Sequence, residues 1–158
     1  MEIFNLLGDE WNETTEHEGY AFKDSWVGAR IGAELIGGSL YEVAPEKKLW
    51  PYHTHHANEE WTIVIRGRPT LRTPDGERAL AEGDVACFLR GPTGAHQIVN
   101  RTDEPVRVLM LSTQADLEVV VYPDSDKMGV SARGIGDGDP VRMLVQGTPS
   151  VGYYDGEE

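Results

Sequence analysis

The sequence has 158 residues, of which 39% are hydrophobic and 26% charged, as expected for one folded globular domain and not for a disordered chain. Its formal net charge of −13 argues against nucleic-acid binding, which needs a basic face, and against anionic membranes. No apolar run approaches the ~20 residues that cross a bilayer. The first residues lack the basic and apolar regions of a signal peptide, so we predict a cytoplasmic protein.

The first part of the chain shows little regular pattern. Aromatic residues are scattered among acidic and small ones over residues 1–30, which predicts an irregular N-terminal arm packed on the rest of the domain or on a partner subunit. Strand signals improve from residue 31 onward. Gly37 and Gly38 predict a break between a segment at 31–36 and an alternating strand at 39–43.

The central part reads as a series of short strands. Residues 60–66 are rich in residues that favour pleated surfaces, and Asp75-Gly76 predicts a hairpin between 70–73 and 77–80. Further strands are predicted at 85–89, 96–99, 106–111 and 117–122. Strands at this spacing, without helices between them, predict an all-β sandwich or barrel.

The pattern divides the chain into three parts. We predict an N-terminal arm at 1–30, a barrel at 31–123 and a C-terminal extension at 124–158. Within the extension, residues 134–140 have the composition of a linker, and residues 141–145 fit a last strand or a helical turn.

Histidines with metal-ligand spacing are the most informative feature. His53 and His55 are two apart, so in a strand they project from the same face and can share one metal ion. A nearby carboxylate, Glu59 or Glu60, and a third imidazole would complete the set. His96 is the best candidate for that imidazole, since His17 lies in the acidic arm and alternation sends His56 to the opposite face. Such ligands suit Fe, Mn, Zn, Ni, Co or Cu.

This order of residues resembles two motifs of the cupin superfamily. The first motif is matched by His53-x-His55, Glu60 and Gly67, and the second by Gly83, Pro92-Thr-Gly94, His96 and Asn100. Lys47 stands where the first motif usually has glycine, and one residue rather than two separates Gly94 from His96. Residues 55–61, 90–96 and 122–127 are also similar to stretches of an uncharacterised bacterial group of single-domain cupins.

The resemblance implies a fold and a site but no substrate. It implies a jelly-roll barrel, also described as a double-stranded β-helix, holding one divalent transition metal on His53, His55, Glu60 and His96. The motif spacing favours Glu60 over Glu59. With Glu60 inward, Trp61, Ile63 and Ile65 face outward and need a cover, either the N-terminal arm or a second subunit. We prefer this resolution and predict a homodimer; the alternative is a bulge that makes Glu59 the ligand.

Other residues have plainer interpretations. Cys87, the single cysteine, lies in an apolar run and is expected to be a buried, inert thiol. Asn100 is expected to serve a turn or a backbone hydrogen bond. The loop at 122–127 could cover the barrel mouth, although a plain polar loop is the favoured interpretation. Tyr41, Trp50, Tyr52 and Arg66 could line a pocket, although aromatic strand residues more often only pack.

Three functions remain open at this point. A metal-dependent enzyme with oxygenase, isomerase or lyase chemistry fits the ligand set, and no separate catalytic residue can be assigned. A non-enzymatic module that binds a sugar or a carboxylate fits as well. The third possibility is a cupin that has lost its metal, because this fold hosts unrelated functions.

Overall fold

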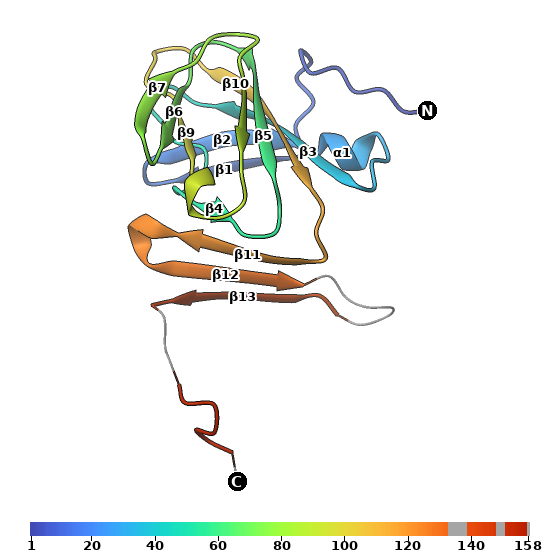
Figure 1. The fold of residues 1–158 in the computed structure, drawn as a ribbon. Coiled ribbons are helices and arrows are strands. Elements are labelled where there is room, and N and C mark those ends of the chain that lie inside the picture. The colour runs from blue at the N-terminus through green and yellow to red at the C-terminus, as the bar shows by residue number, and fades with distance from the viewer. Residues whose placement is uncertain (133–138, 148–150, 158) are drawn as a thin grey trace.

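A computed structural model describes residues 1–132, 139–147 and 151–157. The predicted linker at 134–140 therefore lies mostly outside the described residues, whereas the segment at 141–145 is a strand. Within the described residues no helix has the length and apolar character to cross a membrane. The elements, shown in Figure 1, are β1 (Glu13–His17), β2 (Tyr20–Ser25), α1 (Val27–Arg30), β3 (Ile36–Val43), β4 (Thr54–His55), β5 (Glu60–Arg66), β6 (Thr70–Thr73), β7 (Gly76–Ala79), β8 (Val85–Phe88), the 3₁₀ turn η1 (Pro92–Gly94), β9 (Gln97–Val99), β10 (Val106–Thr113), β11 (Leu117–Tyr122), the 3₁₀ turn η2 (Pro123–Ser125), β12 (Lys127–Ala132) and β13 (Val141–Gln146).

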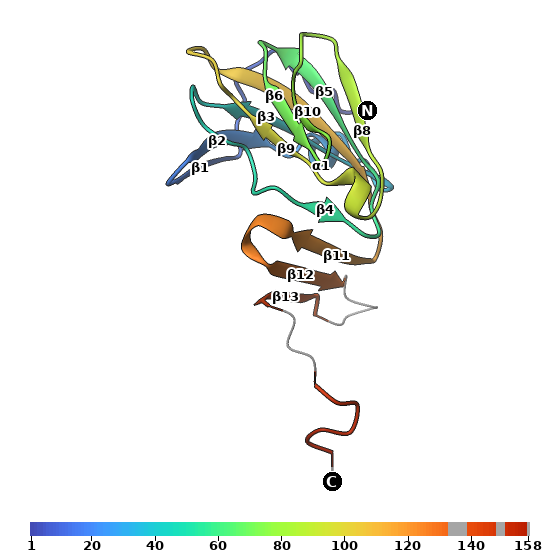
Figure 2. The same ribbon diagram turned by 60° about the vertical axis from the view of Figure 1, so that its left-hand side comes forward.

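The described strands form three antiparallel sheets, as expected for a jelly-roll barrel. The largest has the order β1-β2-β3-β10-β5-β8, and a smaller one has the order β7-β6-β9. A third sheet, β13-β12-β11-β4, lies below the barrel in Figures 1 and 2. The prediction of an all-β cupin-type fold is confirmed. The division into parts at 1–30, 31–123 and 124–158 stays a prediction.

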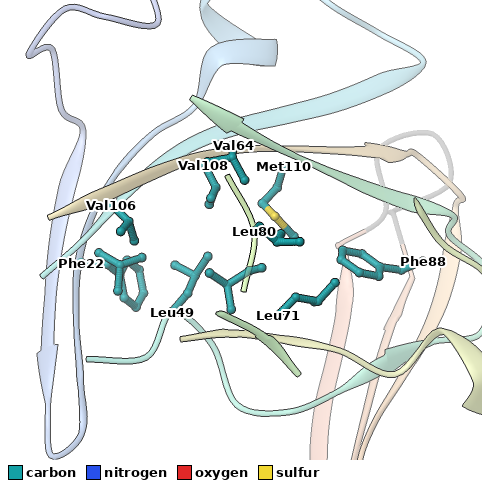
Figure 3. Packing of buried hydrophobic residues seen from close by; sticks show 11 residues of the cluster. Phe22, Leu49, Val64, Leu71, Leu80, Phe88, Val106, Val108 and Met110 are labelled. Carbon is teal, nitrogen blue, oxygen red and sulfur yellow. The ribbon is translucent and has the colours of Figure 1, made fainter. Parts of the chain in front are cut away.

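The main core lies between the six-stranded and three-stranded sheets. Alternation along β5 sends Thr62 and Val64 inward, where both are buried. Figure 3 shows the cluster stretched between Phe22 at one end and Phe88 at the other, with Leu71 and Met110 between them. The metal-ligand candidates lie at the Phe88 end, because the ring of His96 stacks on Phe88 with 3.6 Å between the centroids.

A second apolar cluster covers the outer face of the large sheet. Val27, Leu40 and Leu109 form its buried centre. The residues packed around this centre are Phe4, Leu6, Trp11, Ile63, Ile65 and Leu111. The predicted outward row is therefore real and is covered largely by the N-terminal segment. Trp61 remains 46% exposed, and the homodimer stays a prediction.

Buried Arg107 ties the N-terminal segment to β10. Its guanidinium donates to the carbonyls of Leu6 and Gly8, at 3.1 and 2.8 Å, and to the carboxylates of Asp9 and Glu42, at 3.0 and 2.6 Å. The side chain is only 1% exposed. A buried charge is tolerated only when it is paired in this way, so the segment and the arginine need each other.

The prediction that residues 1–30 are irregular holds for residues 1–12, where the structure has no helix or strand, but is wrong for residues 13–30. β1 and β2 form a hairpin with a regular register from Glu13 opposite Asp24 to His17 opposite Tyr20. β1 is an edge strand with most of its residues exposed, so it carries no apolar alternation from which a strand could be recognised. Of these two strands, only β2 contributes a side chain to the main hydrophobic core, that of Phe22.

The predicted break at Gly37 and Gly38 is also wrong. Both glycines lie inside β3, which runs unbroken opposite β10. A Cβ atom at Gly37 would lie 2.0 Å from the side chain of Gln114, and one at Gly38 would lie 3.2 Å from Leu111 and 3.5 Å from the backbone nitrogen of Gly28 in α1. The glycines therefore reflect packing rather than a turn.

Cys87 is exposed, not buried as expected. β8 is the last strand of the large sheet, and alternation turns Phe88 inward and Cys87 outward, opposite Trp61. The apolar run that contains Cys87 therefore has one buried face and one exposed face. Partial desolvation by the surrounding side chains nevertheless raises the pKa of the Cys87 thiol, and the negative charge of Glu59 raises it further.

Asn100 has the backbone-bonding role expected of it. Its side-chain amide is fully buried and donates to the carbonyls of Val43, Ala44 and Glu104, while its oxygen accepts hydrogen bonds from Thr102.

We predict that Asn100→Ala lowers the free energy of unfolding by about 2–4 kcal/mol, because several buried backbone groups lose their partner. Urea denaturation measures the change. Thr102→Ala is the matched control, with an expected loss of about 1 kcal/mol; equal losses would contradict the assignment.

Candidate metal centre

Three segments of the chain bring the predicted ligands together. His55 lies in β4, Glu60 begins β5, and His53 and His96 lie just before β4 and β9. The backbones of His53 and His96 form an antiparallel bridge with hydrogen bonds of 3.1 and 2.8 Å in the two directions. This bridge fixes the relative position of the two imidazoles.

All four predicted residues converge, and three of them form the tightest group. One ligand atom from each of His53, Glu60 and His96 lies within 4.8 Å of the others, an arrangement that could hold a metal ion. His55 lies beside this group, with its Nε2 atom 3.1 Å from Nε2 of His53 and 3.5 Å from Oε2 of Glu60. It is also more exposed than His96, at 19% against 1% for the side chain.

Backbone carbonyls fix the tautomers of His53 and His96. Nδ1 of His53 lies 2.8 Å from the carbonyl oxygen of Pro51, and Nδ1 of His96 lies 2.9 Å from that of Gly94. A carbonyl can only accept, so each Nδ1 carries the proton and the neutral ring keeps a lone pair on Nε2. Gly94 is required for this approach, since a Cβ atom there would lie 1.7 Å from the carbonyl oxygen of Leu89.

The electrostatics of the site favour unprotonated His53 and Glu60 but favour a proton on His55. Burial, together with the neighbouring His96 and His55, lowers the pKa of His53 to about 4. Burial opposes ionisation of Glu60, but the imidazoles of His55 and His96 outweigh it and hold the pKa of Glu60 at about 2. Burial also lowers the pKa of His55, but the carboxylates of Glu60 and Glu118 outweigh it and raise the pKa above its ordinary value.

Two buried atoms at the centre face each other without a hydrogen bond. Oε2 of Glu60 and Nε2 of His96 lie 3.0 Å apart, yet neither has a hydrogen-bond partner of normal geometry among the described residues. Two acceptors in such contact are unfavourable unless a proton or a cation lies between them. Imidazole nitrogens and one carboxylate oxygen are ligands that divalent transition metals accept, so the residues fit a metal ion.

The geometry favours Glu60 over Glu59 as the carboxylate ligand. The Glu59 side chain accepts a hydrogen bond from Nε1 of Trp61 at 3.1 Å, on the outer side of β5. His56 is exposed, as alternation predicts, and His17 is exposed at the end of β1. Binding of metal by all four residues stays a prediction.

Glu118, which was missed in the sequence, orients His55. Its carboxylate accepts hydrogen bonds from the backbone amides of His56, Ala57 and Asn58 and lies 3.4 Å from Nδ1 of His55. Such outer carboxylates fix the orientation of a ligating imidazole. The available signal was an acidic residue inside the apolar strand at 117–122.

A second missed group lies on the inner face of β2 and β3. Asp24 is buried, lies opposite Tyr41, and has no hydrogen-bond partner for Oδ1 among the described residues. Burial, with a smaller contribution from Glu13, raises the pKa of Asp24. Burial also raises the pKa of Tyr41, and the charges of Asp24 and Glu60 add smaller contributions.

Comparison with known proteins agrees with this architecture. Residues 39–112 match the family model of the cupin domain. The chain contains a cupin domain. The matched residues include the whole candidate centre of this cupin domain, from His53 to His96. No curated protein matched the sequence.

Solved structures similar to this chain include one described as a sugar phosphate isomerase and one provisionally assigned as such. One, from Silicibacter pomeroyi, is 25% identical with a TM-score of 0.76, over 91% of this chain and 92% of that one. The other, a provisionally assigned sugar phosphate isomerase from Acidithiobacillus ferrooxidans, is 28% identical with a TM-score of 0.72, over 81% and 78% of the two chains. A conserved-barrel cupin protein from Salinispora arenicola is 27% identical with a TM-score of 0.52, over 60% and 76%.

The two neighbouring glutamates provide a matched test of the carboxylate ligand. We predict that Glu60→Gln weakens metal binding at least about tenfold, because the neutral amide does not offset the charge of the cation. Glu59→Gln, which changes the same charge one residue away, should leave binding unchanged. Elemental mass spectrometry and metal titration of protein without a histidine tag measure both. Loss of metal in Glu59→Gln alone would show that the ligand is misassigned.

Metal affinity is expected to depend on pH through His55. A ligating imidazole must be unprotonated, and the raised pKa of His55 means that it takes up a proton at a higher pH than an ordinary histidine. Affinity should therefore fall as the pH is lowered from 8 toward 6, while the low pKa of His53 keeps that ring neutral. In His55→Gln the fall should begin at lower pH. The same pH profile in both proteins would contradict a ligand role for His55.

Proposed function

We propose that this cupin domain binds one divalent transition metal through His53, His55, Glu60 and His96 and isomerises a phosphorylated sugar. The main support for a bound metal is that the buried ligand atoms of Glu60 and His96 lie in close contact without a hydrogen bond between them. The substrate class is supported by the two similar structures described or provisionally assigned as sugar phosphate isomerases, both of which match most of this chain.

The chain's own residues suit this reaction. A bound metal would act as a Lewis acid toward the hydroxyl and carbonyl oxygens of the sugar. His53 and His96 keep their Nε2 lone pairs free because their Nδ1 protons are held by backbone carbonyls. His55 and Glu60 are more exposed than His96, with 19% and 15% of their side chains exposed against 1%.

Interconversion of an aldose and a ketose needs a group that holds a proton. The reaction moves one hydrogen from C2 to C1 and one proton between their oxygens, with no net oxidation. Asp24 is a candidate, because its carboxylate is buried, unpartnered at Oδ1 and raised in pKa by burial. Tyr41 lies opposite Asp24 in the neighbouring strand, and the charges of Asp24 and Glu60 both raise its pKa.

Deuterium incorporation tests the proposed activity. Metal-loaded protein incubated in D₂O with pentose and hexose phosphates should convert an aldose to a ketose and exchange the transferred hydrogen, as seen by proton NMR. Glu60→Gln should lower the rate at least about a hundredfold, because the metal is lost or misplaced. Asp24→Asn should lower the rate while leaving the metal content unchanged.

Other outcomes would identify other functions. Stoichiometric metal with saturable sugar binding but no turnover would indicate a binding module and contradict the isomerase. Protein that takes up no metal, even after reconstitution, would indicate a cupin barrel without metal chemistry.

A further inference from the structure

A groove lies beside the metal centre, between three parts of the chain. Its walls come from the β1–β2 hairpin, from the segment 49–52 that precedes His53, and from the turn η2 with the start of β12. Its volume is about 410 Å³, which is enough for a small sugar derivative. None of the four predicted metal ligands lines it.

The groove is a cationic region of a strongly acidic protein. Lys127 lines it, and Nζ of Lys48 lies 5.7 Å from the ring of Tyr20, another lining residue. Neither ammonium group has a carboxylate within 4.0 Å in the described part of the chain. Both are therefore available to an anion, in a chain whose net charge of −13 would otherwise repel one.

The acidic group in the groove is already neutralised. Asp124 is the one carboxylate among the described lining residues, and it forms a two-point ion pair with Arg72 at 2.6 and 2.9 Å. The hydrogen bonds from Arg72 lower the pKa of Asp124, and the charge of Lys48 contributes further. The positively charged side chains of Lys127, Lys48 and Arg72 around the groove therefore outnumber the one carboxylate, that of Asp124.

Aromatic rings form the remaining walls. Trp50 is 38% exposed and contacts Phe22 with 4.7 Å between ring centroids, so one part of its indole is anchored and another part remains open. Tyr20 and Tyr52 also line the groove. Aromatic faces next to a few polar groups form a surface suited to the C–H faces of a sugar ring.

The groove adjoins the metal centre on the Nδ1 side of the His53 ring. Pro51, which lines it, provides the carbonyl that holds Nδ1 of His53. The ring of Tyr122 lies 6.0 Å from the ring of His53 on one side and 5.4 Å from Nζ of Lys127 on the other. The ring of Tyr122 thus lies between Lys127 and His53.

We propose that this groove binds the phosphate end of a phosphorylated sugar, with Lys127 and Lys48 contacting the phosphate and Trp50 contacting the sugar carbons. The assignment rests on the proposed function, because it supposes that the same molecule reaches the metal. It gives the loop at 122–127 a ligand-binding role in place of a plain polar turn.

Calorimetric titration of the metal-loaded protein with inorganic phosphate and with ribose 5-phosphate tests the groove. Lys127→Gln should weaken binding of both about tenfold or more, because a charge-assisted contact is lost. Lys127→Arg should retain most of the affinity. Lys23→Gln removes the same charge on β2, where Lys23 pairs with Glu42 outside the groove, and should change little.

Glu60→Gln separates the groove from the metal centre. If inorganic phosphate binds at the groove, its affinity should survive Glu60→Gln and fall in Lys127→Gln. Loss in Glu60→Gln with no change in Lys127→Gln would place the phosphate on the metal and overturn the proposal, as would equal small losses in Lys127→Gln and Lys23→Gln or no binding at all. Phosphate binding that depends on Lys127, in unaltered protein that takes up no metal even after reconstitution, would support the groove but contradict the isomerase.

Discussion

The backbone bridge between His53 and His96 is the constraint on which the candidate centre depends. Its two hydrogen bonds join segments far apart in the sequence, and each segment then supplies a carbonyl that fixes the Nδ1 proton of its own histidine. Because the backbone holds both rings, their orientation does not depend on a metal. Phe88 stacks on His96 and completes this support from the hydrophobic core.

The predicted ligands could be recognised in the sequence because most of their geometry is local. His53 and His55 share a strand face, and Glu60 begins the next strand, so a short stretch contains three of the four residues. His96 was identified by elimination of the other histidines and by motif order, and despite the shortened loop before it the ring lies beside Glu60. The outward row of β5 followed from the same alternation.

The residues that were missed or misread depend on contacts between distant segments. Glu118 acts through backbone amides some sixty residues earlier in the chain, which no local pattern indicates. Gly37 and Gly38 look like a turn until α1 is packed against them. Cys87 lies in an apolar run, but only the sheet order shows that β8 is an edge strand with an open outer face.

The burial of Arg107 has a consequence for the order of folding. Its partners at Leu6, Gly8 and Asp9 leave the ribosome about a hundred residues before the arginine and must stay hydrated until β10 has been made. β10 is also the strand that joins β3 to β5, so the large sheet closes and the arm docks at a late stage. Long-range closure of this kind slows folding, and the outer face of β5 stays open to wrong partners in the nascent chain until then.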